Sequence, residues 1–121
     1  MKTAKLLIVD DEDDLRELLS QVLAGTGYQI QTAADGEEAL ALLAKESFDV
    51  VLLDIQMPKV DGIQVLKYLK KDKPEVRAIV LTGYADLRNA MEAREFGARD
   101  FISKPYKLED VLSTIERILN E

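Results

Sequence analysis

The chain alternates between short apolar runs and longer segments in which apolar residues repeat at helical spacing. The clearest run is Phe48–Leu53, which is apolar at nearly every position, as expected for a central strand of a parallel sheet. It leads directly into Asp54. The clearest helical pattern has leucine or valine at positions 15, 18, 19, 22 and 23, and it predicts a helix with one apolar face.

Strand and helix patterns follow one another in strict alternation, with connections of a few residues. This order predicts an α/β fold, with a doubly wound, five-stranded parallel sheet and five helices on its two faces. We expect the flavodoxin-like strand order 2-1-3-4-5 and a single domain over residues 1–121. The predicted strands are Lys5–Val9, Tyr28–Ala33, Phe48–Leu53, Ala78–Leu81 and Asp100–Ser103, and the last three predicted helices are Ile63–Leu69, Asp86–Glu95 and Leu108–Leu119.

Composition limits the chemistry that is open to the chain. It contains no cysteine and no histidine, which excludes disulfides, thiolate chemistry and imidazole catalysis. The net charge of -7 repels phosphate backbones and anionic lipids, so we expect neither direct nucleic-acid binding nor membrane binding. The N-terminus has no hydrophobic signal region, and the expected location is the cytoplasm. Any reaction must therefore use carboxylates, hydroxyls and lysines.

Reactive side chains follow four of the predicted strands. Asp10 and Asp11 follow the first strand, Asp54 the third, Thr82 the fourth and Lys104 the fifth. In an open α/β sheet, ligands bind beside the carboxyl ends of the strands where the strand order reverses, here between strands one and three. An acidic run after a strand is more often a solvated helix start than a site. A functional site is favoured here because reactive side chains follow four different strands.

Neighbouring carboxylates repel one another, so such a group either holds protons or recruits a cation. Mg²⁺ suits a cluster of two or three carboxylates and leaves room for a phosphate. Lys104 would then supply a positive charge, and Thr82 a hydroxyl donor, to the phosphate oxygens. An ionised Asp54 would attack phosphorus as a nucleophile and form an acyl phosphate.

Short motifs lie at or beside the predicted strand ends. They are Val9–Glu12 (VDDE), Leu53–Pro58 (LDIQMP), Asp61–Gly62 (DG), Leu81–Gly83 (LTG) and Lys104–Tyr106 (KPY). Each motif is weak alone, but their order and placement make the combination specific. Through these motifs the chain resembles, along its entire length, the receiver domains of response regulators in bacterial two-component systems.

The resemblance implies a phosphorylation-dependent signalling switch, with a role for each matching residue. Asp54 would be the phosphoacceptor, Asp11 a direct Mg²⁺ ligand, Asp10 a ligand through water and the backbone carbonyl of Gln56 a further ligand. Such a domain is not an enzyme beyond catalysing its own phosphorylation and dephosphorylation. Gln56 and Tyr84 would flank the phosphoryl group, and we hypothesise that Tyr84 screens it from water.

The resemblance also implies a switching mechanism. Thr82 would move to bond a phosphoryl oxygen, Lys104 would pair with the same group, and Phe101 would turn inward behind Thr82. The Lys104–Pro105 peptide is expected to be cis. Phe101 stands where the family often has a tyrosine, and from the sequence alone it is equally an ordinary core aromatic.

The implied phosphoryl donor is a sensor histidine kinase or a phosphotransfer protein, because the chain has no histidine and no nucleotide-binding motif. Output is expected on the face of the fourth helix, fifth strand and fifth helix, and a homodimer formed through this face on phosphorylation is a hypothesis. Candidate surface charges there are Arg88, Arg94, Arg99, Asp100 and Arg117.

Two other functions stay open. A phosphatase of the haloacid dehalogenase type also uses an aspartate nucleophile, Mg²⁺, threonine and lysine, but it needs an acid two residues after the nucleophile, where this chain has Gln56. A pseudo-receiver would be an interaction module that never takes up a phosphoryl group. A calcium-binding EF-hand loop starting at Asp10 is excluded, because Leu15 and Gln21 replace its required glycine and glutamate.

Overall fold

The structure is a computed structural model that describes residues 3–54, 62–83 and 93–121. Its elements, in chain order, are β1 (Lys5–Val9), α1 (Asp13–Gly25), β2 (Gln29–Ala33), α2 (Gly36–Lys45), β3 (Val50–Asp54), α3 (Gly62–Asp72), β4 (Arg77–Gly83), β5 (Asp100–Lys104) and α5 (Leu108–Leu119). The predicted helix Asp86–Glu95 lies mostly outside the described residues, and 93–95 are helical. The remaining predicted elements are confirmed to within a few residues.

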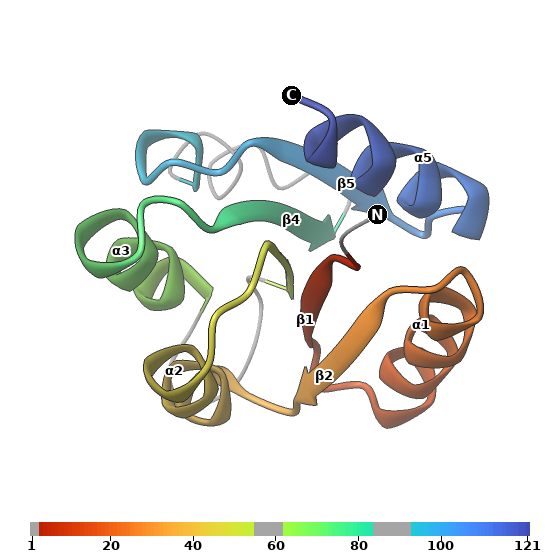
Figure 1. Cartoon of the computed structure of the whole chain (residues 1–121), viewed down its shortest axis with the longest axis horizontal. Helices are drawn as coiled ribbons and strands as arrows, with labels where there is room; N and C mark the ends of the chain where they lie inside the picture. The colour runs from red at the N-terminus through yellow and green to blue at the C-terminus, as the bar shows by residue number, and fades with distance from the viewer. Residues whose placement is uncertain (1–2, 55–61, 84–92) are drawn as a thin grey trace.

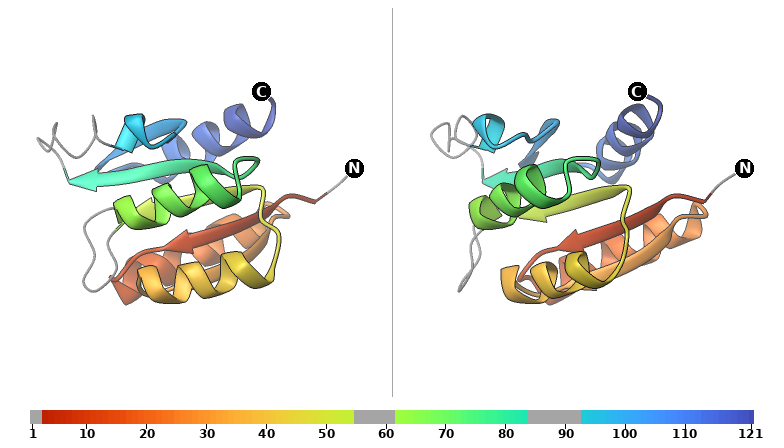
Figure 2. Two further views of the ribbon diagram at one scale, coloured as in Figure 1. Left: turned by 90° about the vertical axis from the view of Figure 1, so that its left-hand side faces the viewer. Right: turned by 60° about the vertical axis from the view of Figure 1, so that its left-hand side comes forward.

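The strands form one parallel sheet in the order β2-β1-β3-β4-β5, as predicted. Helices α2 and α3 cover one face of this sheet, and α1 and α5 cover the other (Figure 1). All the strand arrows that are visible in Figure 2 point toward one end of the molecule, and both chain termini lie at the opposite end. The strand order reverses between the neighbouring strands β1 and β3, which is where this architecture places a ligand.

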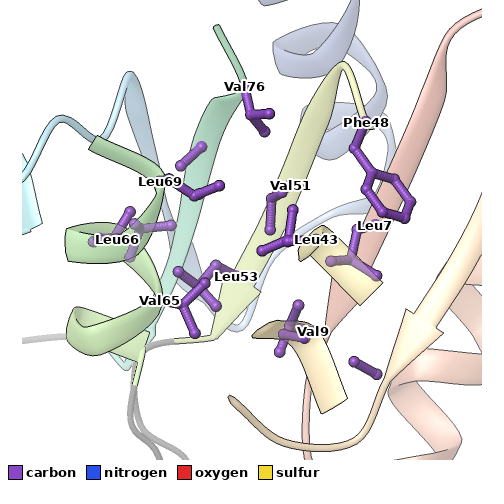
Figure 3. Packing of buried hydrophobic residues seen from close by; sticks show 14 of the residues in the cluster. Leu7, Val9, Leu43, Phe48, Val51, Leu53, Val65, Leu66, Leu69 and Val76 are labelled. Carbon is purple, nitrogen blue, oxygen red and sulfur yellow. The ribbon is translucent and has the colours of Figure 1, made fainter. Parts of the chain in front are cut away.

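Each face of the sheet has its own hydrophobic core, because successive residues of a strand point to opposite faces. On the α2 and α3 side, Leu7 and Val9 of β1 belong to a cluster with Leu53 of β3 (Figure 3). On the α1 and α5 side, Leu6 and Ile8 of β1 pack in a second cluster. The cores hold the short strands rigidly, so the side chains at their carboxyl ends are well positioned.

Local signals explain where helices begin and end. The carboxylate of Asp35 accepts a hydrogen bond from the backbone N–H of Glu38 at 2.9 Å and caps α2. After α1, Gly27 adopts a φ of 100°, a left-handed conformation that favours glycine. Within the described part of the chain, helices are too short or too polar to cross a bilayer.

Candidate functional site

Two buried carboxylates lie at the carboxyl end of the sheet, where β1 and β3 are neighbours. Asp10 directly follows β1 and is fully buried, and Asp54 is the last residue of β3 and is 4% exposed. Asp11 is exposed beside them. One carboxylate oxygen from each of these three residues lies within 4.8 Å of the others. The structure therefore brings together the three aspartates that the sequence proposed as metal ligands.

The backbone around Asp10 is held by several hydrogen bonds. Its N–H donates to the carbonyl of Ala33 at 3.2 Å, which ties it to the end of β2. Its Oδ1 accepts from the N–H of Glu12 at 2.9 Å, and its carbonyl accepts from Nη1 of Arg16 at 2.7 Å. Arg16 also pairs with Asp13, with 2.6 Å between Nη2 and Oδ1. The loop after β1 is thus fixed in the orientation that presents the Asp10 carboxylate to the site.

Lys104, the last residue of β5, reaches the same group of acids. Its Nζ lies 3.0 Å from Oδ2 of Asp54, 3.3 Å from Oδ2 of Asp10 and 3.4 Å from Oε1 of Glu12. Burial lowers the pKa of Lys104, but hydrogen bonds and charge interactions with Asp54 and Asp10 outweigh it and raise the pKa above its ordinary value. The ammonium is therefore charged at neutral pH. The Lys104–Pro105 peptide is cis, as the resemblance implied.

Several carboxylates and one ammonium lie close together here. Asp10, Glu12 and Asp54 pair with Lys104, and Asp11 lies beside Asp10 and Asp54. Two of these carboxylates are almost completely removed from solvent, where neighbouring carboxylates repel one another and a nearby cation stabilises them. Carboxylate oxygens that converge from separate strands are the ligands that a hard divalent cation prefers. The residues present fit Mg²⁺.

Thr82 lies on β4, close to this edge of the sheet. In the strand register, Asp54 pairs with Leu81, and Thr82 pairs with Ser103 of β5. The backbone of Thr82 is therefore one position beyond the level of Asp54, on the neighbouring strand.

Phe101 lies on β5 and is half-buried. It packs against the core on the α2 and α3 side, and the guanidinium of Arg94 lies 5.5 Å from its ring centroid. Both interpretations of Phe101 made from the sequence, switch residue and core aromatic, are compatible with this position. Gln56, Tyr84 and Arg88, which were named as candidate functional residues, lie outside the described residues.

Sequence reasoning gave no role to three residues that the structure places at the site. Glu12 was part of a motif, but its contact with Lys104 spans 92 residues of sequence. Arg16 binds the carbonyl of Asp10 from one turn into α1. Tyr106 follows the Lys-Pro pair, and burial, followed by the negative charge of Asp10, raises the pKa of Tyr106 to about 12. Glu12 and Tyr106 had a signal in the sequence, since each belongs to one of the short motifs, whereas Arg16 had none.

The hydroxyl of Tyr106 leads to a stability prediction. This oxygen is buried, and no described residue provides it with a hydrogen-bond partner. Because an unsatisfied buried hydroxyl is unfavourable, Tyr106→Phe is expected to raise the free energy of unfolding by about 0.5–1 kcal/mol. Urea unfolding followed by circular dichroism measures the change, with Tyr28→Phe at the opposite end of the sheet as the control. A loss of stability in Tyr106→Phe would contradict the prediction.

Comparisons with known proteins agree with this geometry. Residues 6–116 match the family described as response regulator receiver domain. The chain is 38% identical over 119 residues to sporulation initiation phosphotransferase F of Bacillus subtilis, with 98% of this chain and 96% of that protein covered. It is 40% identical over 115 residues to regulatory protein AtoC of Escherichia coli, with 95% of this chain but 25% of that protein covered.

A solved structure gives the same result. The chain matches a CheY-like response regulator receiver domain protein from Methanospirillum hungatei with a TM-score of 0.94 and 34% identity, covering 98% of this chain and 95% of that one. The protein belongs to the response regulator receiver domain family. It is a phosphoryl-accepting signalling domain of the kind found in two-component systems and phosphorelays.

Proposed function

We propose that the domain accepts a phosphoryl group on Asp54, with Mg²⁺ held by Asp10, Asp11 and Asp54 and with Lys104 paired to the phosphoryl oxygens. The observation that carries the proposal is the approach of three carboxylates to within 4.8 Å beside an ammonium that is 3.0 Å from Asp54. A nucleophile, an acidic cation site and a fixed positive charge are the parts that phosphoryl transfer to a carboxylate requires.

In the proposed reaction, a carboxylate oxygen of Asp54 attacks phosphorus in line with the leaving group. A bond between this oxygen and phosphorus forms, and the bond between phosphorus and the donor breaks. The donor leaves as neutral imidazole after taking up a proton when it is a phosphohistidine, and as acetate when it is acetyl phosphate. Hydrolysis later returns the carboxylate, when water attacks phosphorus and the acyl oxygen leaves.

Lys104 and Thr82 are proposed to stabilise the transferring group. Lys104 carries a permanent charge at neutral pH, and its ammonium is already within hydrogen-bonding distance of Asp54. Thr82 would donate its hydroxyl to a phosphoryl oxygen from the adjacent strand. When bound, Mg²⁺ would neutralise negative charge that develops on the phosphoryl oxygens. The backbone carbonyl of Gln56, outside the described residues, is the further ligand that the family resemblance implies.

The proposed donor is the phosphohistidine of a sensor histidine kinase or of a phosphotransfer protein, and the proposed compartment is the cytoplasm. Residues 1–121 contain no histidine, so the phosphohistidine would lie outside this domain. Leu18 on α1 is 45% exposed, whereas Leu19 is fully buried. We propose that the donor docks on this helix near Leu15, Leu18 and Leu19, of which Leu18 is the most exposed.

The proposed output is a change of the face formed by the helix before β5, β5 itself and α5, driven by Thr82 and Phe101. A new anion on Asp54 offers contacts to Thr82 and Lys104 that exist only in the phosphorylated form, and such contacts shift a conformational population. Arg117 pairs with Asp100, and Arg99 and Arg117 both pair with Glu121. These charges are satisfied within the chain, so a phosphorylation-dependent homodimer through this face would have to exchange some of these ion pairs.

Phosphoryl uptake from acetyl phosphate tests the proposed function. We expect the intact mass to increase by one phosphoryl group, and the gain to be labile to base, as an acyl phosphate is. The gain should require Mg²⁺, and Asp11→Asn should need a higher Mg²⁺ concentration, because one oxygen ligand loses its charge. Mass spectrometry of both proteins, with EDTA or a series of Mg²⁺ concentrations and before and after base treatment, measures these four effects.

Other outcomes point to the alternative functions. A folded protein that binds Mg²⁺ and gains no mass would be a pseudo-receiver. Rapid, continuous release of phosphate from an added phosphate ester would indicate a phosphatase of the haloacid dehalogenase type. We expect neither, because the proximity of Lys104 and the three aspartates supports uptake, and the position of the phosphatase's second acid holds Gln56.

A further inference from the structure

Glu12 occupies the N-cap of α1 but does not cap it. This position favours short side chains whose oxygen accepts a helix N–H, and the side chain of Glu12 makes no capping hydrogen bond. Its Oε1 instead lies 3.4 Å from Nζ of Lys104. Its backbone N–H donates to Oδ1 of Asp10 at 2.9 Å. Both contacts direct Glu12 toward the acidic site.

The ammonium of Lys104 has three N–H donors, and it has three carboxylate partners in this structure. These partners are not equivalent. Asp10 is fully buried and Asp54 is 4% exposed, so either carboxylate would lose a hydrogen bond that water could not readily replace. The Glu12 side chain is 63% exposed and is the most distant of the three at 3.4 Å. Release of Glu12 to solvent is therefore the least costly way to free a donor.

We propose that Glu12 is a positioning residue that holds the Lys104 ammonium in the unmodified domain and yields it to the incoming phosphoryl group, so that it slows phosphorylation. The inference rests on the proposed function, in which Lys104 pairs with oxygens of a phosphoryl group on Asp54. Glu12 acts in two ways. It occupies a donor that the phosphoryl oxygens need, and its negative charge repels a dianionic phosphoryl donor that approaches Asp54.

The test is the rate of phosphoryl uptake in Glu12→Gln, measured by intact mass at subsaturating acetyl phosphate in the presence of Mg²⁺. Glutamine keeps the size of the side chain and removes its charge. At an ionic strength of about 0.15 M, we expect the second-order rate constant to rise about three- to tenfold. The reason is that the variant lacks a negative charge that lies closer to the reacting phosphate than the Debye length, so that salt screens it only partly. The ratio of the variant rate to the native rate should fall toward one as the ionic strength approaches about 1 M.

Asp14→Asn is the matched control, because it removes the same charge from the first turn of α1. Asp14 is exposed, and it forms no hydrogen bond or ion pair with a described residue. Its rate constant should change less than about twofold under the same conditions. The urea midpoint of Glu12→Gln should match that of the native protein, since no capping bond is lost. A merely structural role for Glu12 would shift this midpoint and would not accelerate uptake.

The outcomes separate this inference from the proposed function. An unchanged or slower rate in Glu12→Gln, or an equal acceleration in Asp14→Asn, would overturn the role of Glu12 while the native protein still takes up phosphate. Failure of the native protein itself to gain mass would instead refute the proposed function. Selective, salt-sensitive acceleration in Glu12→Gln would establish Glu12 as the residue that restrains Lys104.

Discussion

Replacing Asp54 by alanine is expected to slow phosphoryl uptake from acetyl phosphate by at least about a hundredfold, because the attacking oxygen is lost. The neighbouring acids are poor substitutes. Asp10 is fully buried, with one carboxylate oxygen bound to the N–H of Glu12 and the other near Lys104. Intact mass after incubation with Mg²⁺, followed by peptide mapping of any residual label, measures the effect.

The matched control for Asp54→Ala is Asp72→Ala, which removes an exposed carboxylate at the end of α3. This variant should take up the phosphoryl group as the native protein does. Asp54→Ala should still unfold cooperatively in urea, because Lys104 keeps Asp10 and Glu12 as partners. A label of native amount on Asp11 or another residue in Asp54→Ala would contradict the assignment of Asp54 as acceptor.

Replacing Lys104 by methionine is expected to lower the free energy of unfolding by about 2–4 kcal/mol at pH 7 in the absence of Mg²⁺. Methionine retains much of the apolar stem but leaves the buried carboxylates of Asp10 and Asp54 without their common cation. Removal of one partner from a buried ion pair is costly, because the remaining charge stays out of water. Urea unfolding measures the loss, and added Mg²⁺ should restore part of it by binding the same carboxylates.

The pH dependence of this loss follows from the direction of the pKa shift. The pKa of Lys104 is raised in the folded state, so its contribution to stability is fully present below its ordinary pKa of 10.5 and is lost only as the pH rises through the folded-state value. The difference between native protein and Lys104→Met should thus be constant from about pH 6 to about pH 9. It should shrink below about pH 4, where carboxyl groups take up protons.

Lys107→Met is the control for Lys104→Met. Lys107 is exposed in the loop that follows Lys104, and its side chain makes no capping bond at the start of α5. Loss of this charge should change the free energy of unfolding by less than about 0.5 kcal/mol. Equal losses in the two variants would show that the buried contacts of Lys104 do not stabilise the fold.

Most of the fold could be predicted from periodicity. Apolar residues on both faces of β3 required a central strand, and all five of its residues are buried. The prediction of a helix at α1 is confirmed, but the predicted apolar face is wider than the buried face. Leu19 and Leu23 are buried, whereas Leu18 is 45% exposed. Spacing along a helix defines a face, but its buried width depends on the sheet surface against which the helix packs.

The three aspartates of the acidic site could be predicted as well, whereas the contact of Glu12 with Lys104 was not. In a parallel sheet, strand order alone brings residues at the carboxyl ends of neighbouring strands to one edge. The predicted strand ended at Leu53, one residue before the observed end of β3 at Asp54, because a polar residue usually marks where a strand has ended. The pairing of Asp54 with Leu81 of β4 depends on the register between two strands, which local sequence does not contain.

The sequence by itself thus determined the alternation of strands and helices, the two-sided core and the set of carboxylates at the sheet edge, because each depends on residue type and short-range spacing. Only the tertiary structure decided which groups touch. The contacts of Lys104 with Asp54 and Glu12 join residues 50 and 92 positions apart. The hydroxyl of Tyr106, for which the described part of the chain offers no hydrogen-bond partner, likewise depends on what surrounds it. Such contacts follow from loop paths and side-chain rotamers, which are set when the whole chain packs.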